Sequence, residues 1–182
     1  RGQSHPHLIE LLDFGIVYVE PWKANRFVII FAKPEGVTLA SLLEEGKLYK
    51  HSDVMKRLIV PLVTALHKLE TLGVNHGAIN PRNVFVAPSG VVLGECVAEP
   101  AGLMQPAIYE PLEHMQAMEE ARGNGTIASD MYALAMLALD AVGELSSRKL
   151  LNRAQLNTLL IARGSYNVFV HEGHFQNQMI DF

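Results

Sequence analysis

The sequence predicts an α+β protein, with strands near its beginning and helices over most of the rest. Residues 16–20 and 26–32 are rich in β-branched and aromatic side chains, which predicts two strands joined by the turn at 21–25. Apolar residues recur at three- and four-residue spacing between 52 and 72, and again between 145 and 161, which predicts helices.

The composition excludes several classes of function. The chain has 182 residues, 49% of them hydrophobic and 19% charged, with a formal net charge of −4. This balance provides no basic surface for nucleic acid. No apolar run reaches the ~18 residues that a membrane span needs. Cys96 is the single cysteine, so an internal disulfide is excluded and we expect a reducing, cytoplasmic location.

The second predicted strand leads into a recognisable connection. Residues 27–32, F-V-I-I-F-A, are all apolar, as in a strand that is buried on both faces. The run K-P-E-G at 33–36 ends the strand, and a helix is expected to begin within 37–43. Such a strand, turn and helix occur in many α/β proteins.

The predicted helix at 52–72 has signals at both ends. Ser52 or Asp53 is a candidate N-cap, and Gly73 is a candidate stop, where a residue with positive φ is wanted. Pro61 lies inside the pattern and is expected to kink the helix. The helix leads directly to a polar loop that begins at Asn75.

This loop reads N-H-G-A-I-N-P-R-N over 75–83. It resembles the catalytic loop of eukaryotic-type protein kinases, H-R-D-L-K-P-x-N. The matching positions are His76, Ile79, Pro81 and Asn83. The differing positions are Gly77 in place of Arg, Ala78 in place of Asp, and Asn80 in place of Lys. A histidine in a loop also invites a general-base interpretation, but the resemblance implies that His76 braces the loop.

The substitution at Ala78 removes the residue that does the chemistry. A positioned carboxylate that deprotonates a hydroxyl contributes about 10²- to 10⁴-fold in rate, and a methyl group cannot accept a proton. We therefore expect no catalytic residue in this loop.

The next segment bears on cofactors. Residues 91–97, V-V-L-G-E-C-V, resemble the kinase stretch V-K-L-x-D-F-G, with Glu95 in place of the magnesium-binding Asp. The resemblance makes Asn83 and Glu95 candidate ligands for Mg²⁺ and for the phosphates of ATP. It likewise makes Phe31, Ala32 and Lys33 candidate adenine contacts through their backbone groups. The other interpretation of Asn83 is a loop asparagine that hydrogen-bonds its own backbone.

A second anchor lies at 129–134, S-D-M-Y-A-L, which resembles the start of the kinase F helix, S-D-[IV]-[WY]-[AS]-L. An aspartate in the first turn of a helix interacts favourably with the helix dipole in any protein. The resemblance further implies a structural role, in which Asp130 holds the backbone of the loop. Residues 107–113, A-I-Y-E-P-L-E, loosely resemble the kinase A-P-E stretch, with Pro111 and either Glu110 or Glu113 as candidates and no role assigned.

The resemblance covers roughly residues 5–163 and predicts a protein kinase-like fold. Residues 1–32 would be the end of the small lobe, with its fourth and fifth strands, and residues 33–182 a large lobe that is truncated at its C-terminus. We expect a fragment, because Arg1 begins in mid-pattern and no G-x-G-x-x-G phosphate loop occurs up to Phe182.

The leading hypothesis is a bacterial-type pseudokinase that serves as a regulatory, protein-binding module in signalling. The competing hypothesis is a divergent active serine/threonine kinase in which Asn83 and Glu95 hold Mg²⁺ and ATP, since positioning carries much of phosphoryl transfer. A third is an unrelated α/β interaction domain, which requires that the loop at Asn75 and Asp130 lie apart.

Overall fold

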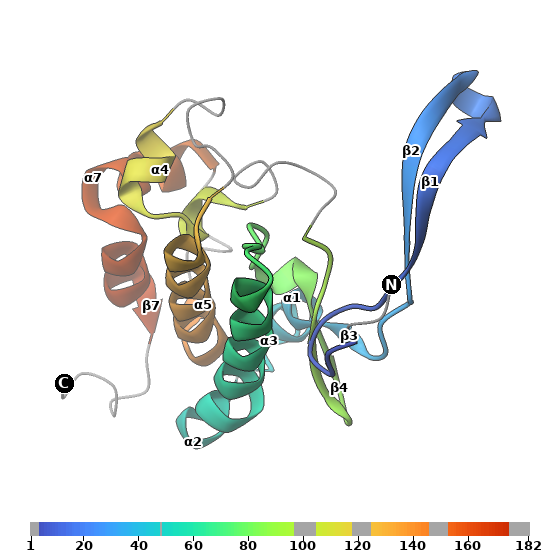
Figure 1. Ribbon diagram of the computed structural model, residues 1–182. Helices are drawn as coiled ribbons and strands as arrows, with labels where there is room; N and C mark the ends of the chain where they lie inside the picture. Colours follow the sequence, from blue (N-terminus) through green and yellow to red (C-terminus); the bar gives the residue numbers. More distant parts are fainter. Residues whose placement is uncertain (1–3, 48, 97–104, 118–124, 146–152, 175–182) are drawn as a thin grey trace.

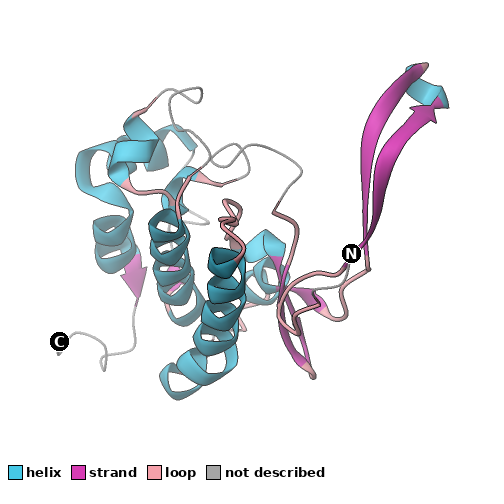
Figure 2. Ribbon diagram, viewed as in Figure 1, coloured by secondary structure: helices cyan, strands magenta, loops and turns pink. Residues whose placement is uncertain are grey.

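The structure is a computed structural model that describes residues 4–47, 49–96, 105–117, 125–145 and 153–174. Within these ranges the protein has mixed α and β structure, as predicted (Figures 1 and 2). The strands are β1 (Leu11–Val19), β2 (Ala24–Phe31), β3 (Val37–Thr38), β4 (Val84–Ala87), β5 (Gly90–Leu93), β6 (Glu144–Leu145) and β7 (Gly173–His174). The α-helices are α1 (Leu39–Glu44), α2 (His51–Val54), α3 (Val60–Thr71), α4 (Leu112–Gln116), α5 (Ile127–Val142) and α7 (Arg153–Glu172).

The body of the molecule is a group of helices packed beside a small antiparallel sheet. Helices α3, α5 and α7 lie side by side, and the sheet, in the order β3-β4-β5, lies on the far side of α3 from α5 (Figure 1). Their apolar faces form one core, to which these buried side chains belong: Leu58, Leu62, Leu66, Ile79, Val84, Leu93, Leu134, Leu137 and Phe169. The core therefore joins the helices to strands β4 and β5, which follow the loop at 75–83.

Strands β1 and β2 form a separate antiparallel hairpin that projects from this body (Figure 1). The prediction that 27–32 is a strand is confirmed, but the prediction that it is buried on both faces is wrong, since Phe27 is 63% exposed. Among the described residues, the hairpin's two strands pair only with each other. Apolar composition predicted burial, but no further strand or helix of the described chain covers these side chains.

The helical stretch predicted at 52–72 is confirmed, with two differences in detail. It begins at His51 after Lys50, which makes no side-chain cap, so the predicted caps Ser52 and Asp53 are wrong. A π-helical segment, η2 (Met55–Ile59), lies just before Pro61. Proline has no N–H and its ring clashes with the carbonyl four residues earlier, so a wider turn relieves the strain.

The predicted helix boundaries elsewhere are confirmed in part. Gly73 has φ 69°, in agreement with a helix stop there. Helix α1 begins directly after the short strand β3, and the side chain of Thr38 accepts a hydrogen bond from the Ser41 N–H. In α7 the chain breaks at Gly164, with φ 74° and ψ 160°, but it resumes as helix through Glu172, where no helix was predicted.

Residues 146–152 of the helix predicted at 145–161 lie outside the described residues, as do 97–104 of the segment after Cys96. Within the described ranges, none of the helices combines the length and the apolar character that crossing a membrane requires.

Candidate functional site

In the loop between α3 and the 3-10 helix η3 (Pro81–Asn83), the part that carries the kinase-like motif is buried, whereas residues 72–74 are exposed. Ala78, at the position of the missing base, is only 4% exposed, and His76, Ile79 and Asn80 are buried as well. A buried loop needs internal partners for its backbone polar groups, because no water reaches them. The side chains around the loop supply these partners.

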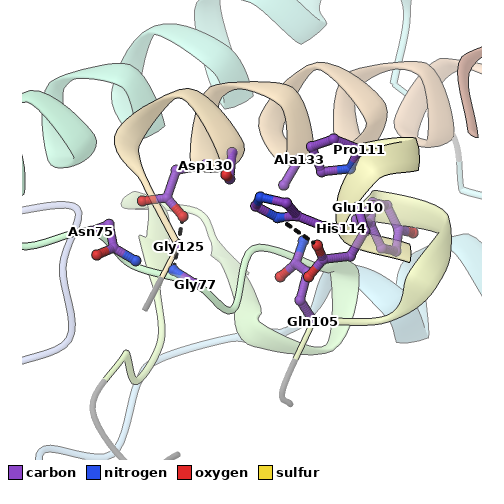
Figure 3. A pocket seen from close by; sticks show the side chains of 11 residues that line it. Asn75, Gly77, Gln105, Glu110, Pro111, His114, Gly125, Asp130 and Ala133 are labelled. Atoms are coloured by element: carbon purple, nitrogen blue, oxygen red, sulfur yellow. Dashed lines mark hydrogen bonds and ion pairs between the residues drawn. The ribbon is translucent and has the colours of Figure 1, made fainter. Parts of the chain in front are cut away.

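Asp130, in the first turn of α5, binds the loop from one side. Its Oδ2 accepts a hydrogen bond from the His76 N–H at 2.6 Å. Its Oδ1 accepts one from the Gly77 N–H at 2.8 Å, which Figure 3 shows. Helix α5 is itself capped by Thr126, whose hydroxyl oxygen accepts a hydrogen bond from the Ser129 N–H at 3.2 Å. Burial raises the pKa of Asp130, and the two N–H donors oppose that rise.

This contact decides one of the three sequence hypotheses. The unrelated-domain hypothesis requires that the loop and Asp130 lie apart, whereas the carboxylate and the loop backbone are in direct hydrogen-bond contact. The separation that this hypothesis requires is therefore not found.

His76 supports the loop from within. Its Nδ1 accepts a hydrogen bond from the Ala78 N–H at 3.2 Å, so the proton sits on Nε2, which donates to the Gly94 carbonyl at 3.2 Å. Burial lowers the pKa of His76 to about 4, and the bond to Gly94 only partly opposes this. Both ring nitrogens of this neutral, buried side chain are engaged within the protein, so His76 has no free nitrogen with which to act as a base.

Asn83 ties the loop to the chain that leaves β5. Its Nδ2 donates to the Ala78 carbonyl at 2.9 Å and to the Glu95 carbonyl at 2.8 Å. The Gly94 N–H in turn donates to the Asn83 carbonyl at 2.8 Å. A Cβ atom at Gly94 would lie 2.0 Å from Asn83 Oδ1, so the side-chain amide fills the space that any other residue would need.

The candidate magnesium ligands, Asn83 and Glu95, are joined by a hydrogen bond. Mg²⁺ requires octahedral oxygen coordination and is usually held by one or two carboxylates together with waters and substrate phosphates. Here Asn83 Oδ1 lies close to Gly94, and Asn83 Nδ2 donates to the backbone carbonyl of Glu95. The described residues also contain no group of three or more His, Cys, Asp or Glu side chains arranged around a common ion. Binding of Mg²⁺ and of ATP phosphates by Asn83 and Glu95 stays a prediction.

The candidate adenine contacts lie at the base of the hairpin. Phe31 is the last residue of β2 and pairs with Leu11, and the Ala32 N–H donates to the Glu10 carbonyl at 2.8 Å. Lys33 is exposed. Adenine binding at these residues stays a prediction, and the backbone donor of Ala32 is already engaged.

Cys96 directly follows Glu95, and its thiol has low reactivity. Burial raises the pKa of its thiol to about 11, and the negative charges of Asp130 and Glu95 add to the rise. The thiolate, which is the reactive form, is therefore scarce at neutral pH.

Sequence reasoning missed Gln105. Its Nε2 donates to the Ile79 carbonyl at 2.7 Å, so this side chain gives the loop a further support from a distant segment. Gln105 lies in a stretch without periodicity, and its partner is 26 residues away, so no local pattern marks it. Of the two A-P-E candidates, Glu110 is buried and pairs with His114 at 3.1 Å, whereas Glu113 is exposed.

No family model matches the chain. Over 144 residues the chain is 24% identical to the probable serine/threonine-protein kinase PknB of Lactococcus lactis subsp. lactis (strain IL1403). The matched region is 75% of this chain and 22% of that kinase, so the chain spans about a fifth of the relative's length. The similarity is distant and kinase-like.

Proposed function

We propose that this chain is part of a kinase-like scaffold that does not transfer phosphate and acts as a regulatory, protein-binding module in the cytoplasm. The observation that carries the proposal is Ala78. In the register of the kinase-like loop it stands at the base position, and its methyl group is buried within a loop whose backbone is held by side chains on several sides. A hydroxyl substrate would meet no proton acceptor there.

The surroundings of the loop support a structural use of the site. His76, Asn83 and Asp130 all direct their polar atoms at backbone groups of the loop or of the strand exit. These contacts hold the loop in one conformation. In this proposal residues 1–32 belong to a small lobe and residues 33–182 to a large lobe.

The projecting hairpin supports a role in protein binding. Large apolar side chains are exposed along it, namely Leu11, Leu12, Phe14, Ile16, Val17, Tyr18, Trp22, Phe27 and Ile30. Extended apolar surfaces of this kind mark interaction sites in soluble proteins, and tryptophan and tyrosine are enriched in protein interfaces.

The first test is nucleotide binding measured by thermal unfolding, with ATP from micromolar to millimolar, alone and with Mg²⁺ or Mn²⁺. A ligand at a hundredfold excess over Kd stabilises the folded state by about 2.7 kcal/mol, which raises Tm by roughly 5–10 °C in a protein of this size. We expect no metal-dependent rise. Such a rise, together with transfer of labelled phosphate to a protein substrate, would instead establish the divergent kinase.

A second test asks whether only the base is missing. We expect Ala78→Asp to show no phosphate transfer and to lower the free energy of unfolding by several kcal/mol, because it buries a carboxylate. Ala78→Asn is the matched control, of equal size but without the charge, and should destabilise less. Phosphate transfer by Ala78→Asp and not by Ala78→Asn would show that the site is otherwise competent.

A further inference from the structure

A small cavity lies behind the loop, between the first turns of α5 and the segment that carries Gln105 (Figure 3). Its volume is about 20 Å³, and polar side chains from all three elements line it, among them Asn75, Gln105, Glu110, His114 and Asp130. A cavity of roughly 10–15 Å³ is enough to hold a water molecule. The space is therefore large enough for one.

Gln105 supplies an unsatisfied acceptor in the wall of this cavity. Its side chain is only 8% exposed, and the bond from Nε2 to the Ile79 carbonyl fixes which way the amide points. The reverse orientation would set two oxygens against each other. Oε1 is thus buried, and within the described part of the chain it has no hydrogen-bond partner. Buried polar atoms in native proteins almost always have one.

We propose that the cavity binds one ordered water molecule, which donates a hydrogen bond to Gln105 Oε1. The carboxylates of Glu110 and Asp130 also line the cavity and are acceptors, each oxygen having more than one lone pair. The ligand must therefore bring donors, and water is the smallest neutral molecule with two.

The water makes Gln105 a positioning residue for the loop. Gln105 binds the loop directly through Nε2 and, by way of the water, the carboxylate side of the cavity. The bridge joins the loop to two segments distant from it in sequence.

The experiment is a high-resolution crystal structure of the wild-type protein combined with oxygen-17 magnetic relaxation dispersion, which detects long-lived internal waters. We expect density about 2.7–3.0 Å from Gln105 Oε1 and a dispersion signal that Gln105→Met reduces by one water. Gln116→Met, an exposed change on α4, is the matched control and should leave the signal unaltered.

A dry cavity in the wild-type structure, or Oε1 bonded to a protein donor, would overturn the proposal. An unchanged dispersion signal in a folded Gln105→Met would do the same. If Gln105→Met does not fold, the wild-type crystal structure decides alone.

Discussion

The loop at His76 and the β1–β2 hairpin differ in what surrounds them. In the loop, backbone donors at 76, 77 and 78 all meet acceptors on Asp130 or His76, and the side chains are buried. In the hairpin, the two strands pair with each other along their inner edges, but many apolar side chains are exposed. The loop is held by specific hydrogen bonds, whereas the hairpin exposes its apolar side chains.

The difference indicates which of the two regions contributes more to the stability of the folded protein. A two-stranded hairpin is at best marginally stable alone, because it buries little apolar surface. The loop is held by side chains from distant segments, so its loss would leave buried donors and acceptors without partners. Substitutions should therefore be costly in the loop and nearly neutral in the hairpin.

The largest effect is expected from Asp130→Ala. It leaves the N–H groups of His76 and Gly77 without acceptors. Hydrogen bonds to a charged group contribute about 1.5–3 kcal/mol each, so we expect a loss of roughly 3–6 kcal/mol. Chemical denaturation measures it. Asp53→Ala, also in the first turn of a helix, is the control and should cost less than about 1 kcal/mol. Equal losses in the two variants would contradict the assigned role of Asp130.

Acid should weaken the loop through His76. Its folded-state pKa is about 4, whereas an unfolded histidine has a pKa near 6.5, so the unfolded state takes up the proton first. Above about pH 6.5 the neutral His76 makes its full contribution to the free energy of unfolding. As pH falls toward 4 this contribution is lost, and the free energy of unfolding decreases by roughly 3 kcal/mol. The raised pKa of Asp130 acts in the opposite direction.

The measurement is urea denaturation from pH 7 to pH 4, on the wild type and on His76→Gln, which does not titrate. The wild type should lose more stability over this interval than the variant. Parallel curves would show that His76 does not govern the acid response.

The sequence could predict the frame of this site because local patterns encode it. The helix ending near Gly73 and the loop at 75–83 each carry a nearby signal, and Asp130 lies at the start of an apolar helical pattern. Gly94 and Gln105 could not be found in this way. Their importance comes from atoms that approach them from distant segments, and no periodicity records such an approach.

The sequence failed at the hairpin for a different reason. An all-apolar strand indicates that burial is favourable, but it does not say what provides the burial. In the described residues Phe27 is 63% exposed and Ile30 is 49% exposed, so composition and observed exposure disagree.

A smaller effect is expected at the junction of Asn83 and Gly94. In Gly94→Ala the new methyl would overlap Asn83 Oδ1, and moving the amide breaks its bonds to the Ala78 and Glu95 carbonyls, at a cost of about 2 kcal/mol. In an Asn83→Ala background the amide is absent and the nearest remaining atom is the Asn83 carbonyl oxygen, at 3.1 Å. The same change should then cost about 1 kcal/mol less, which is a usual size for such couplings. Additive losses in this double-mutant cycle would refute the packing argument.

The smallest effect is expected in the hairpin. Ile16 is 75% exposed, so Ile16→Val should alter the free energy of unfolding by less than about 0.5 kcal/mol. Ile79→Val removes the same methyl group from a residue that is 1% exposed and should cost about 0.5–1.5 kcal/mol. Urea denaturation of both variants gives the comparison at matched chemistry. Equal losses would mean that another part of the protein covers Ile16 in solution, and the contrast between an open hairpin and a closed loop would then fail.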